Sequence, residues 1–247
     1  MRAVVELEQR CADAWPALVD RPLGQWRLRA AGGFTGRANS ALTTGDPGLP
    51  VADALAEVID FATATANGIA PTAHVVVGAP VESRVGAAGW RVDVDHPGGV
   101  ESLVMTGRPA GFATPKSAEV SILGAPVPGW WELTARPDPT PAQRHVLASG
   151  PVVGFGVVER DGVVLAAVRG AVVGDLLHVA RLAVRPGARR LGLARELMGG
   201  LAAWGLERGA TTCALQVAEH NKPAISLYES LGCVEHHRYR YWVANHS

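Results

Sequence analysis

The chain has 247 residues, which is long enough for one large domain or for two small ones that each bury a hydrophobic core. Hydrophobic residues make up 48% of it and charged residues 19%, and 23 basic side chains balance 23 acidic ones. This composition is typical of a globular protein, and it gives no net charge that would attract nucleic acid or an anionic membrane. Two folded units are the favoured interpretation.

The sequence predicts neither a membrane span nor a secretion signal. Its longest apolar run, residues 163–173, is interrupted by Arg169, and residues 1–8 turn acidic where a signal peptide would be apolar. The three cysteines are too widely spaced for paired metal ligands or a disulfide framework. We therefore expect a cytoplasmic protein that has neither a membrane nor a metal as a partner.

The first half alternates between helices and strands. Apolar residues at helical spacing predict a helix over residues 3–19, and period-two alternation predicts two strands that meet at Gly32-Gly33. A second helix, a strand and a short helix that stops at Gly89 come next, followed by two more strands. The predicted strands are 25–30, 34–43, 74–77, 90–94 and 101–105, and the second helix is 51–66.

A proline-rich stretch, residues 107–118, reads as a linker to the second half. There a helix from Pro139 to Ala148 precedes three strands, and the most regular amphipathic helix of the chain, residues 190–207, follows them. The predicted strands are 152–158, 163–173, 176–184, 212–217 and 234–243, and the last helix is 223–231.

The two halves repeat one order of elements: strand, loop, long helix, strand, short helix ending in glycine, strand. The matching segments are 39–42, 51–66, 74–77 and Gly89-Trp90 in the first half, and 182–184, 190–207, 212–217 and Gly232-Cys233 in the second. This order indicates an ancient duplication, although two unrelated α/β units would also share it by chance.

An arginine pair and a glycine stand where a predicted strand passes into the regular helix, in the run Arg189-Arg190-Leu191-Gly192-Leu193-Ala194. The unpaired amides and the dipole of a helix N-terminus attract anions, and glycine lets a phosphate approach the backbone closely. The residues alone leave two interpretations open, a phosphate site or an ordinary turn with solvated arginines. A P-loop is excluded, because the chain has only two lysines, Lys116 and Lys222, and neither stands in a Gly-Lys-Ser/Thr run.

A second motif follows the strand predicted at residues 212–217. Asn221 stands at a helix cap position and Pro223 near the first helical position, while Tyr228 lies two turns beyond Asn221 on the same face. Together with the arginine run, this motif resembles the GNAT superfamily of acetyl-CoA-dependent N-acetyltransferases. The Arg/Gln-x-x-Gly-x-Gly/Ala signature of that superfamily is found here as Arg189-x-x-Gly192-x-Ala194.

The resemblance covers about residues 115–247 and implies the GNAT fold, an α/β architecture in which helices flank a central sheet of mixed antiparallel and parallel strands. The first half, through residues 26–40, looks like the added N-terminal half of some bacterial GNAT proteins. We therefore predict tandem GNAT-like halves, with a degenerate domain over residues 1–112 and a catalytic domain over residues 113–247. We call the run from Arg189 to Ala194 the cradle, and Arg189 and Arg190 the cradle arginines. Since the loop 45–50 has no such arginines, we expect one catalytic centre per chain.

The resemblance also implies a reaction and a site. Acetyl-CoA would donate its acetyl group to a primary amine by direct attack, with the pantetheine arm lying between splayed strands 176–184 and 212–217. Tyr228 is the implied general acid for the departing thiolate. The residues implied to bind acetyl-CoA are Leu182, Ala183, Val184, Arg189, Arg190, Leu191, Gly192, Leu193, Ala194, Arg195 and Asn221.

His178 is the candidate general base. It stands six residues before Val184, which matches the glutamate base of histone-acetylating members, and a histidine titrates near neutrality. Structural alternatives stay open for each candidate: a hydrogen-bonded strand histidine, a packed Tyr228 and a capping Asn221. The adjacent pair His236-His237 could line an acceptor site but lacks metal-ligand geometry.

The acceptor is predicted only as an amine of a small metabolite or of a protein. Several residues on adjacent strands of the first half could meet an acceptor, but a solvated arginine face is the favoured explanation. These residues are Trp26, Arg27, Arg29, Arg37 and Asn39. Two other hypotheses remain, a CoA-binding sensor or scaffold without turnover and an aminoacyl-tRNA-dependent transferase, the second opposed by the neutral charge. A monomer or a homodimer is expected.

Overall fold

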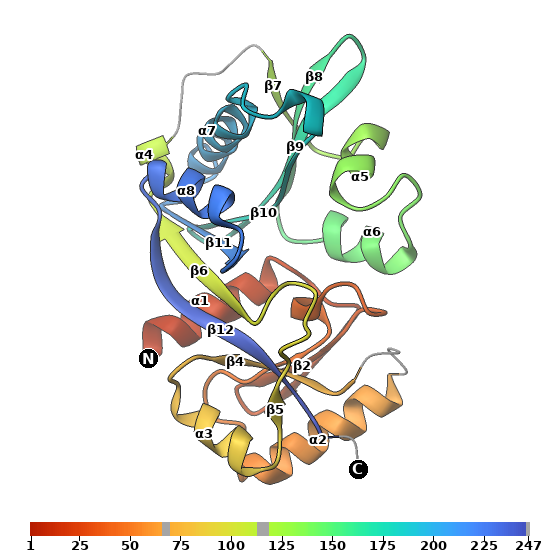
Figure 1. Cartoon of the computed structure of the whole chain (residues 1–247), viewed down its shortest axis with the longest axis vertical. Coiled ribbons are helices and arrows are strands. Elements are labelled where there is room, and N and C mark those ends of the chain that lie inside the picture. The colour runs from red at the N-terminus through yellow and green to blue at the C-terminus, as the bar shows by residue number, and fades with distance from the viewer. Residues whose placement is uncertain (66–69, 113–118, 246–247) are drawn as a thin grey trace. The chain divides into compact units, whose positions relative to one another are not determined.

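The structure of the protein is a computed structural model (Figure 1). It describes residues 1–65, 70–112 and 119–245. The predicted linker at residues 107–118 therefore lies partly outside the described residues, as does the predicted end of the second helix at Ala66. Among the helices that the structure describes, none combines the length and the apolar character that crossing a membrane requires.

The chain divides into two compact units. The first contains residues 1–104, 218–221 and 236–247, and the second contains residues 105–217 and 222–235. Strands β6 (Glu101–Gly107) and β12 (Val234–Val243) contribute residues to both.

The first unit contains a sheet of mixed direction. Strands β1 and β2 pair antiparallel, as do β2 and β3, whereas β3 and β4 run parallel. Strand β4 then pairs antiparallel with β12, which also pairs with the short β5. The strands are β1 (Val19–Leu23), β2 (Trp26–Ala30), β3 (Ala41–Leu42), β4 (Thr72–Val76) and β5 (Arg91–Val92).

Helices cover both faces of this sheet (Figure 1). Helices α2 (Val51–Ala64) and α3 (Pro80–Ala87) pack on the face that carries Trp26, which is fully buried with the apolar core of the unit. Helix α1 (Arg2–Asp13) lies against the other face, where Arg29 of β2 donates to the carbonyl of Ala12. Because side chains alternate along a strand, one apolar and one arginine-bearing face follow directly from the sequence of β2.

The second unit has strands in the spatial order β11, β10, β9, β8 and β7. Only β10 and β11 pair parallel, and the pairs from β7 to β10 are antiparallel. The strands are β7 (Val120–Leu123), β8 (Val153–Arg160), β9 (Val163–Val173), β10 (Leu176–Val184) and β11 (Thr212–Ala218).

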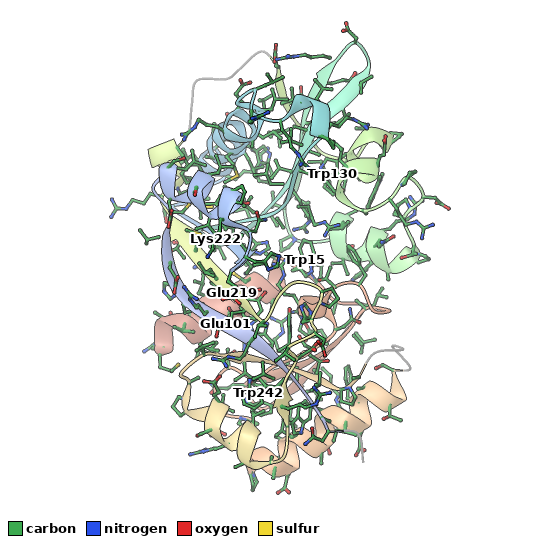
Figure 2. The ribbon with its side chains drawn as sticks, viewed as in Figure 1. Trp15, Glu101, Trp130, Glu219, Lys222 and Trp242 are labelled. Carbon is green, nitrogen blue, oxygen red and sulfur yellow. The ribbon has the colours of Figure 1, made fainter. Side chains whose placement is uncertain are left out.

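Helix α7 (Leu193–Leu206) covers one face of these strands, and α5 (Pro128–Thr134) covers the other (Figure 1). Glycines let α7 approach closely, since a Cβ at Gly170 would lie 2.7 Å from Leu201. On the α5 side, Trp130 donates from its indole nitrogen to the carbonyl of Val168 at 3.0 Å (Figure 2). The remaining helices of this unit are α4 (Pro109–Phe112), α6 (Pro141–Ala148) and α8 (Lys222–Ser230).

Some predicted elements differ from those observed. The first helix ends at Asp13 instead of residue 19, and a short connection leads from it to β1, which begins at Val19. The strand predicted over 34–43 shrinks to β3, because Asn39 holds the preceding residues in a loop: its Oδ1 accepts from the amide of Ala31 at 2.7 Å and its Nδ2 donates to Thr35 at 2.8 Å. Strand β7 and helix α5 were not predicted.

Candidate active site

Strands β10 and β11 run together and then part. Their parallel pairing begins at Leu176 and Thr212 and ends at Val179 and Leu215. Beyond Val179, β10 continues to Val184 while its described pairing partner is β9 alone. The edge of β10 that faced β11 is therefore left without a strand partner, which confirms the predicted splay. Backbone groups there can bond to a bound molecule instead.

The end of β10 is bent by a bulge. The register against β9 shifts between Ala180 and Ala183, and Arg181 takes a left-handed conformation with φ +59°. The guanidinium of Arg181 secures this bend, since its Nε donates to the carbonyl of Thr134 at 2.6 Å. A β-bulge re-aims the backbone and side chains that follow it. Sequence reasoning missed Arg181, although an arginine inside an apolar strand was a signal that something binds it.

Arg185, which directly follows β10, is fixed in place by its own side chain. The Nε atom of Arg185 donates to the carbonyl of Val164 at 2.7 Å, and its terminal nitrogens form a two-pronged contact with Glu132 at 2.9 Å each. The hydrogen bonds from Arg185 hold the pKa of Glu132 below its usual value. These contacts hold the first residue of the loop between β10 and α7 in place.

The loop between β10 and α7 corrects the predicted start of the helix. A short 3-10 turn spans Pro186–Ala188, after which Arg190 has φ +63° and Gly192 has φ +83°. Left-handed residues cannot continue a right-handed helix, so α7 begins at Leu193 instead of Arg190. Glycine adopts this conformation without steric cost, which explains its presence at the position directly before the helix.

The amides of this loop point to an anion site. In the part of the chain that the structure describes, no carbonyl accepts from the backbone amides of residues 190–195, and the first bond of the helix comes from Glu196 to Gly192 at 3.1 Å. The side chains of Arg189 and Arg190 are exposed beside these amides. Unpaired amides, the helix dipole and two arginines together favour a phosphate. Arg195 contacts the hydroxyl of Ser230 in α8.

Tyr228 lies in α8 and is almost buried, with 8% of its surface exposed. Burial, together with the thiols of Cys213 and Cys233, raises its pKa to about 12. The phenol therefore keeps its proton throughout the neutral range and is held ready to donate it. This placement suits a general acid, and it equally describes the packed aromatic that the sequence left as an alternative.

Asn221 is exposed and directly precedes Lys222, the first residue of α8 (Figure 2). Its backbone amide donates to the carbonyl of Ala218 at 2.9 Å, so the chain turns sharply between β11 and α8. Its predicted contact with CoA stays a prediction.

His178 lies in the paired part of β10, opposite Ala214 of β11. Its ring has no solvent-exposed surface, and Nε2 is 2.9 Å from Oε1 of Gln216. This is the environment of a hydrogen-bonded strand histidine, the alternative that the sequence left open. A general base must reach the amine that it deprotonates, so the catalytic role of His178 stays a prediction.

The arginines of the first unit are not the solvated face that the sequence favoured. Arg27 contacts Asp20 and donates to Asp13 at 2.6 Å, and Arg29 is only 4% exposed. Arg37 stacks on the ring of Trp15 at 4.5 Å. The prediction was wrong because it left out α1 and the segment after it, which cover this side of β2.

Of the histidine pair at residues 236–237, His236 is exposed, and His237 joins an acid-base cluster with the buried residues Glu8 and His74 in the first unit. His237 Nε2 lies 2.7 Å from Oε1 of Glu8, and His74 Nε2 lies 3.3 Å from the other carboxylate oxygen. Burial would raise the pKa of Glu8, but the charge of His74 and the hydrogen bond from His237 outweigh it and hold that pKa well below its usual value. Sequence reasoning missed Glu8, because 229 residues separate it from His237.

Comparison with solved structures identifies the fold. A GCN5-related N-acetyltransferase from Kribbella flavida is 16% identical, with a TM-score of 0.65 over 100% of this chain and 95% of its own. A structure described as a GNAT-family acetyltransferase, from Novosphingobium aromaticivorans DSM 12444, is 21% identical, with a TM-score of 0.59 over 97% and 99%. A tandem GNAT protein from the clavulanic acid biosynthesis pathway is 16% identical, with a TM-score of 0.54 over 71% and 64%.

These similarities confirm the predicted fold class: the protein has the GNAT fold, with a mixed sheet flanked by helices. The family model described as "Probable histone acetyltransferase Rv0428c C-terminal" matches residues 2–242, and the chain belongs to that family. Among curated proteins, none matches this sequence. Family and fold together support acyl transfer as the general class of activity.

Proposed function

We propose that the protein is an acetyl-CoA-dependent N-acetyltransferase that acts on a primary amine of a small metabolite or a protein. The observation that carries the proposal is the parting of β10 and β11 directly before a loop whose amides are unpaired. A thioester with a phosphate-bearing tail fits these two features in that order. The acetyl end meets the unpaired strand edge, and the phosphates meet the helix N-terminus.

Two groups of residues hold the CoA, one at the pantetheine arm and one at the pyrophosphate. Backbone groups of Leu182, Ala183 and Val184, at the open edge of β10, bond to the pantetheine arm and to the thioester carbonyl. The amides from Arg190 to Arg195 and the side chain of Arg189 hold the pyrophosphate, and Asn221 adds a contact. Donors that face the oxygen on which negative charge develops lower the barrier by a few kcal/mol.

The chemistry is one addition and one elimination. The lone pair of the amine attacks the thioester carbonyl carbon, and the bond from carbon to sulfur breaks as the carbonyl reforms. The CoA thiolate takes a proton from the phenol of Tyr228, and the new amide loses the proton of the former amine. Because the pKa of Tyr228 is raised to about 12, the phenol is fully protonated before each turnover.

His178 is the proposed acceptor of the amine proton, on the strength of its position on β10 beside Gln216. Its burial makes the proposal easy to test. A His178→Gln variant whose rate keeps the pH dependence of the wild type would give the ring a structural role only. Loss of the acidic limb of the profile, near the usual histidine pKa, would support the base.

We also propose that residues 113–247 form the catalytic domain and that residues 1–112 are a degenerate copy. The cradle arginines and the tyrosine of α8 lie in the later part only, while the order of elements recurs in both. One catalytic centre per chain follows from this arrangement.

The test is release of CoA thiol from acetyl-CoA with a panel of amines that includes polyamines, amino sugars and lysine peptides. We expect turnover with at least one class, and a rate lower by roughly 100-fold in Tyr228→Phe with unchanged acetyl-CoA affinity. Tight binding of acetyl-CoA without turnover on any amine would instead identify a CoA sensor and overturn the proposed reaction.

A further inference from the structure

The first unit repeats the local framework of the CoA site. In each unit a short helix has a proline at its start and a left-handed glycine nine residues later, Pro80 and Gly89 in one and Pro223 and Gly232 in the other. Both helices end in the same backbone bonds, since the amide of Trp90 donates to Val85 at 3.3 Å and that of Cys233 donates to Tyr228 at 3.0 Å. The position of Tyr228 therefore corresponds to Val85, which has no hydroxyl.

The strands of the first unit part in the same way. Strands β3 and β4 pair parallel at Ala41 with Ala73 and at Leu42 with His74, and the last bond joins the amide of Thr43 to the carbonyl of His74 at 3.2 Å. Beyond it, the chain after β3 turns toward α2 while β4 continues to Val76. The two segments enclose a pocket, the β3–β4 pocket, with a volume of about 310 Å³.

The walls of the β3–β4 pocket are mainly aliphatic. They are formed by α1, the start of α2, the end of β4 and the start of α3. The apolar residues that line it include Val4, Val5, Val51, Val76 and Val81. Its volume is at the lower end of the range for small-molecule sites.

A phosphate does not fit at this pocket. The loop before α2 contains Pro47 and Pro50, which have no amide hydrogen, and the amide of Gly48 is already bonded to the carboxylate of Asp46 at 2.8 Å. Asp53 adds a second negative charge in the first turn of α2. This helix end therefore has fewer amide donors than the loop before α7 and two carboxylates beside them, so it is a poorer site for a pyrophosphate than the N-terminus of α7.

One cation at the rim of the pocket lacks a partner. Arg84 of α3 lines it with an exposed side chain, and no acid among the described residues forms an ion pair with Arg84. The other polar side chains of the lining have partners within the chain: the hydroxyl of Thr43 donates to the carbonyl of His74 at 2.9 Å, that of Thr44 accepts from Gln9 at 3.0 Å, and the carboxylate of Asp46 accepts from the amide of Gly48 at 2.8 Å. Charge complementarity therefore favours an anionic head group at the rim and an aliphatic tail inside.

We propose that the β3–β4 pocket binds a short aliphatic carboxylate, with its carboxylate on Arg84 and its chain among the valines of the pocket. The site makes use of the duplicated framework after the loss of its phosphate-binding loop. The proposal does not depend on acetyl transfer by the second unit.

The probe is hexanoate, titrated into the full chain and followed by ligand-observed NMR. Arg84→Glu reverses the charge at the rim, and Val81→Trp fills the pocket. Arg91→Glu, at an exposed arginine of β5, is the matched charge control. Hexan-1-ol and hexylamine, which share the tail but differ in the head group, separate the contribution of the carboxylate. Thermal melts confirm that each variant is folded.

We expect saturable binding of hexanoate that weakens by about tenfold or more in Arg84→Glu, is lost in Val81→Trp and is unchanged in Arg91→Glu. Hexan-1-ol and hexylamine should bind more weakly than hexanoate, and acetyl-CoA should not compete. Absence of binding, equal binding by both pocket variants and the wild type, or displacement by acetyl-CoA would each overturn the site. Equal affinity for hexylamine would overturn the assignment of the head group.

Discussion

The two units place opposite chemistry on the same scaffold. Each has parallel strands that part before a long helix, and each has a short helix that ends in a left-handed glycine. In the second unit, Arg189, Arg190 and unpaired amides stand at the N-terminus of the long helix. In the first unit, prolines and Asp46 occupy the corresponding loop. A scaffold of this kind therefore provides a gap, and the loop before the helix decides what the gap can bind.

The short helix shows the same contrast. Tyr228 has a phenol in one unit, whereas Val85 at the matching position of the other is a fully buried part of the core beside α2 and Trp90. Trp242 packs beside Gly86 on the same α3 helix (Figure 2). At this position the first unit therefore has apolar packing where the second has a phenol, although the strands and helices around it follow the same order.

The largest effect is expected from removing the proposed acid. Tyr228→Phe should lower kcat by roughly 100-fold, and by the same factor from pH 6 to pH 10, because a pKa of about 12 keeps the phenol protonated over that range. The measurement is a pH profile of kcat for both proteins. A rate that falls near pH 8 in the wild type but not in Tyr228→Phe would contradict this role for the phenol.

The second-largest effect is expected from reversing the charge of the cradle arginines. Arg189→Glu combined with Arg190→Glu should raise the KM for acetyl-CoA by about 30-fold, since hydrogen bonds to charged groups are worth about 1.5–3 kcal/mol, with little change in kcat. Arg91→Glu makes a charge reversal in the first unit and should leave KM unchanged. A double variant with the KM of the wild type would show that the loop does not hold the pyrophosphate.

The stability of the first unit should depend on its buried charged residues. Glu8→Gln should lower the free energy of unfolding by about 2 kcal/mol at pH 7, because a carboxylate that is hydrogen-bonded to His237 and lies 3.3 Å from His74 is replaced by a neutral amide. The folded-state pKa of Glu8 lies below that of the unfolded chain, so its stabilising contribution is present above about pH 5 and falls as the pH drops further.

Urea titrations of Glu8→Gln and the wild type at several pH values measure this contribution. The difference between the two proteins should shrink below about pH 4, and acetyl-CoA affinity should be the same in both. A difference that grows toward acid pH would mean that Glu8 is protonated in the folded state.

The smallest effects are expected at two left-handed glycines. Gly192→Ala and Gly48→Ala should each cost about 1 kcal/mol of stability, because φ is +83° and +75° at positions where a Cβ has room. Only Gly192→Ala should also weaken acetyl-CoA binding. Gly187→Ala, where a Cβ is unobstructed and the backbone is not left-handed, is the control. Equal loss of acetyl-CoA affinity in Gly48→Ala would contradict the contrast between the loops.

Local patterns predicted much of the second unit. The bounds of β9, β10 and β12 match those expected from alternation and turn residues, and the arginine run lies in the loop between β10 and the long helix, as expected. These features depend on neighbouring residues, which a sequence displays directly. The start of α7 was missed by three residues, because the left-handed conformation of Arg190 does not follow from its side chain.

Features that depend on distant residues were not predictable. Arg181 shapes the open edge of β10 by bonding to Thr134, 47 residues earlier in the chain. The burial of His178 likewise comes from packing that strand position alone does not reveal. Alternation placed Arg29 correctly on the face opposite Trp26, but α1 buries that face and only the fold shows it.

The most direct test of the central claim is the stoichiometry of acetyl-CoA binding by isothermal titration, in the wild type and in the Arg189→Glu, Arg190→Glu double variant. We predict one site per chain in the wild type and a loss of most of its affinity in the variant. Two sites per chain, or one site that keeps its affinity in the variant, would contradict the assignment of acyl-CoA binding to the loop between β10 and α7.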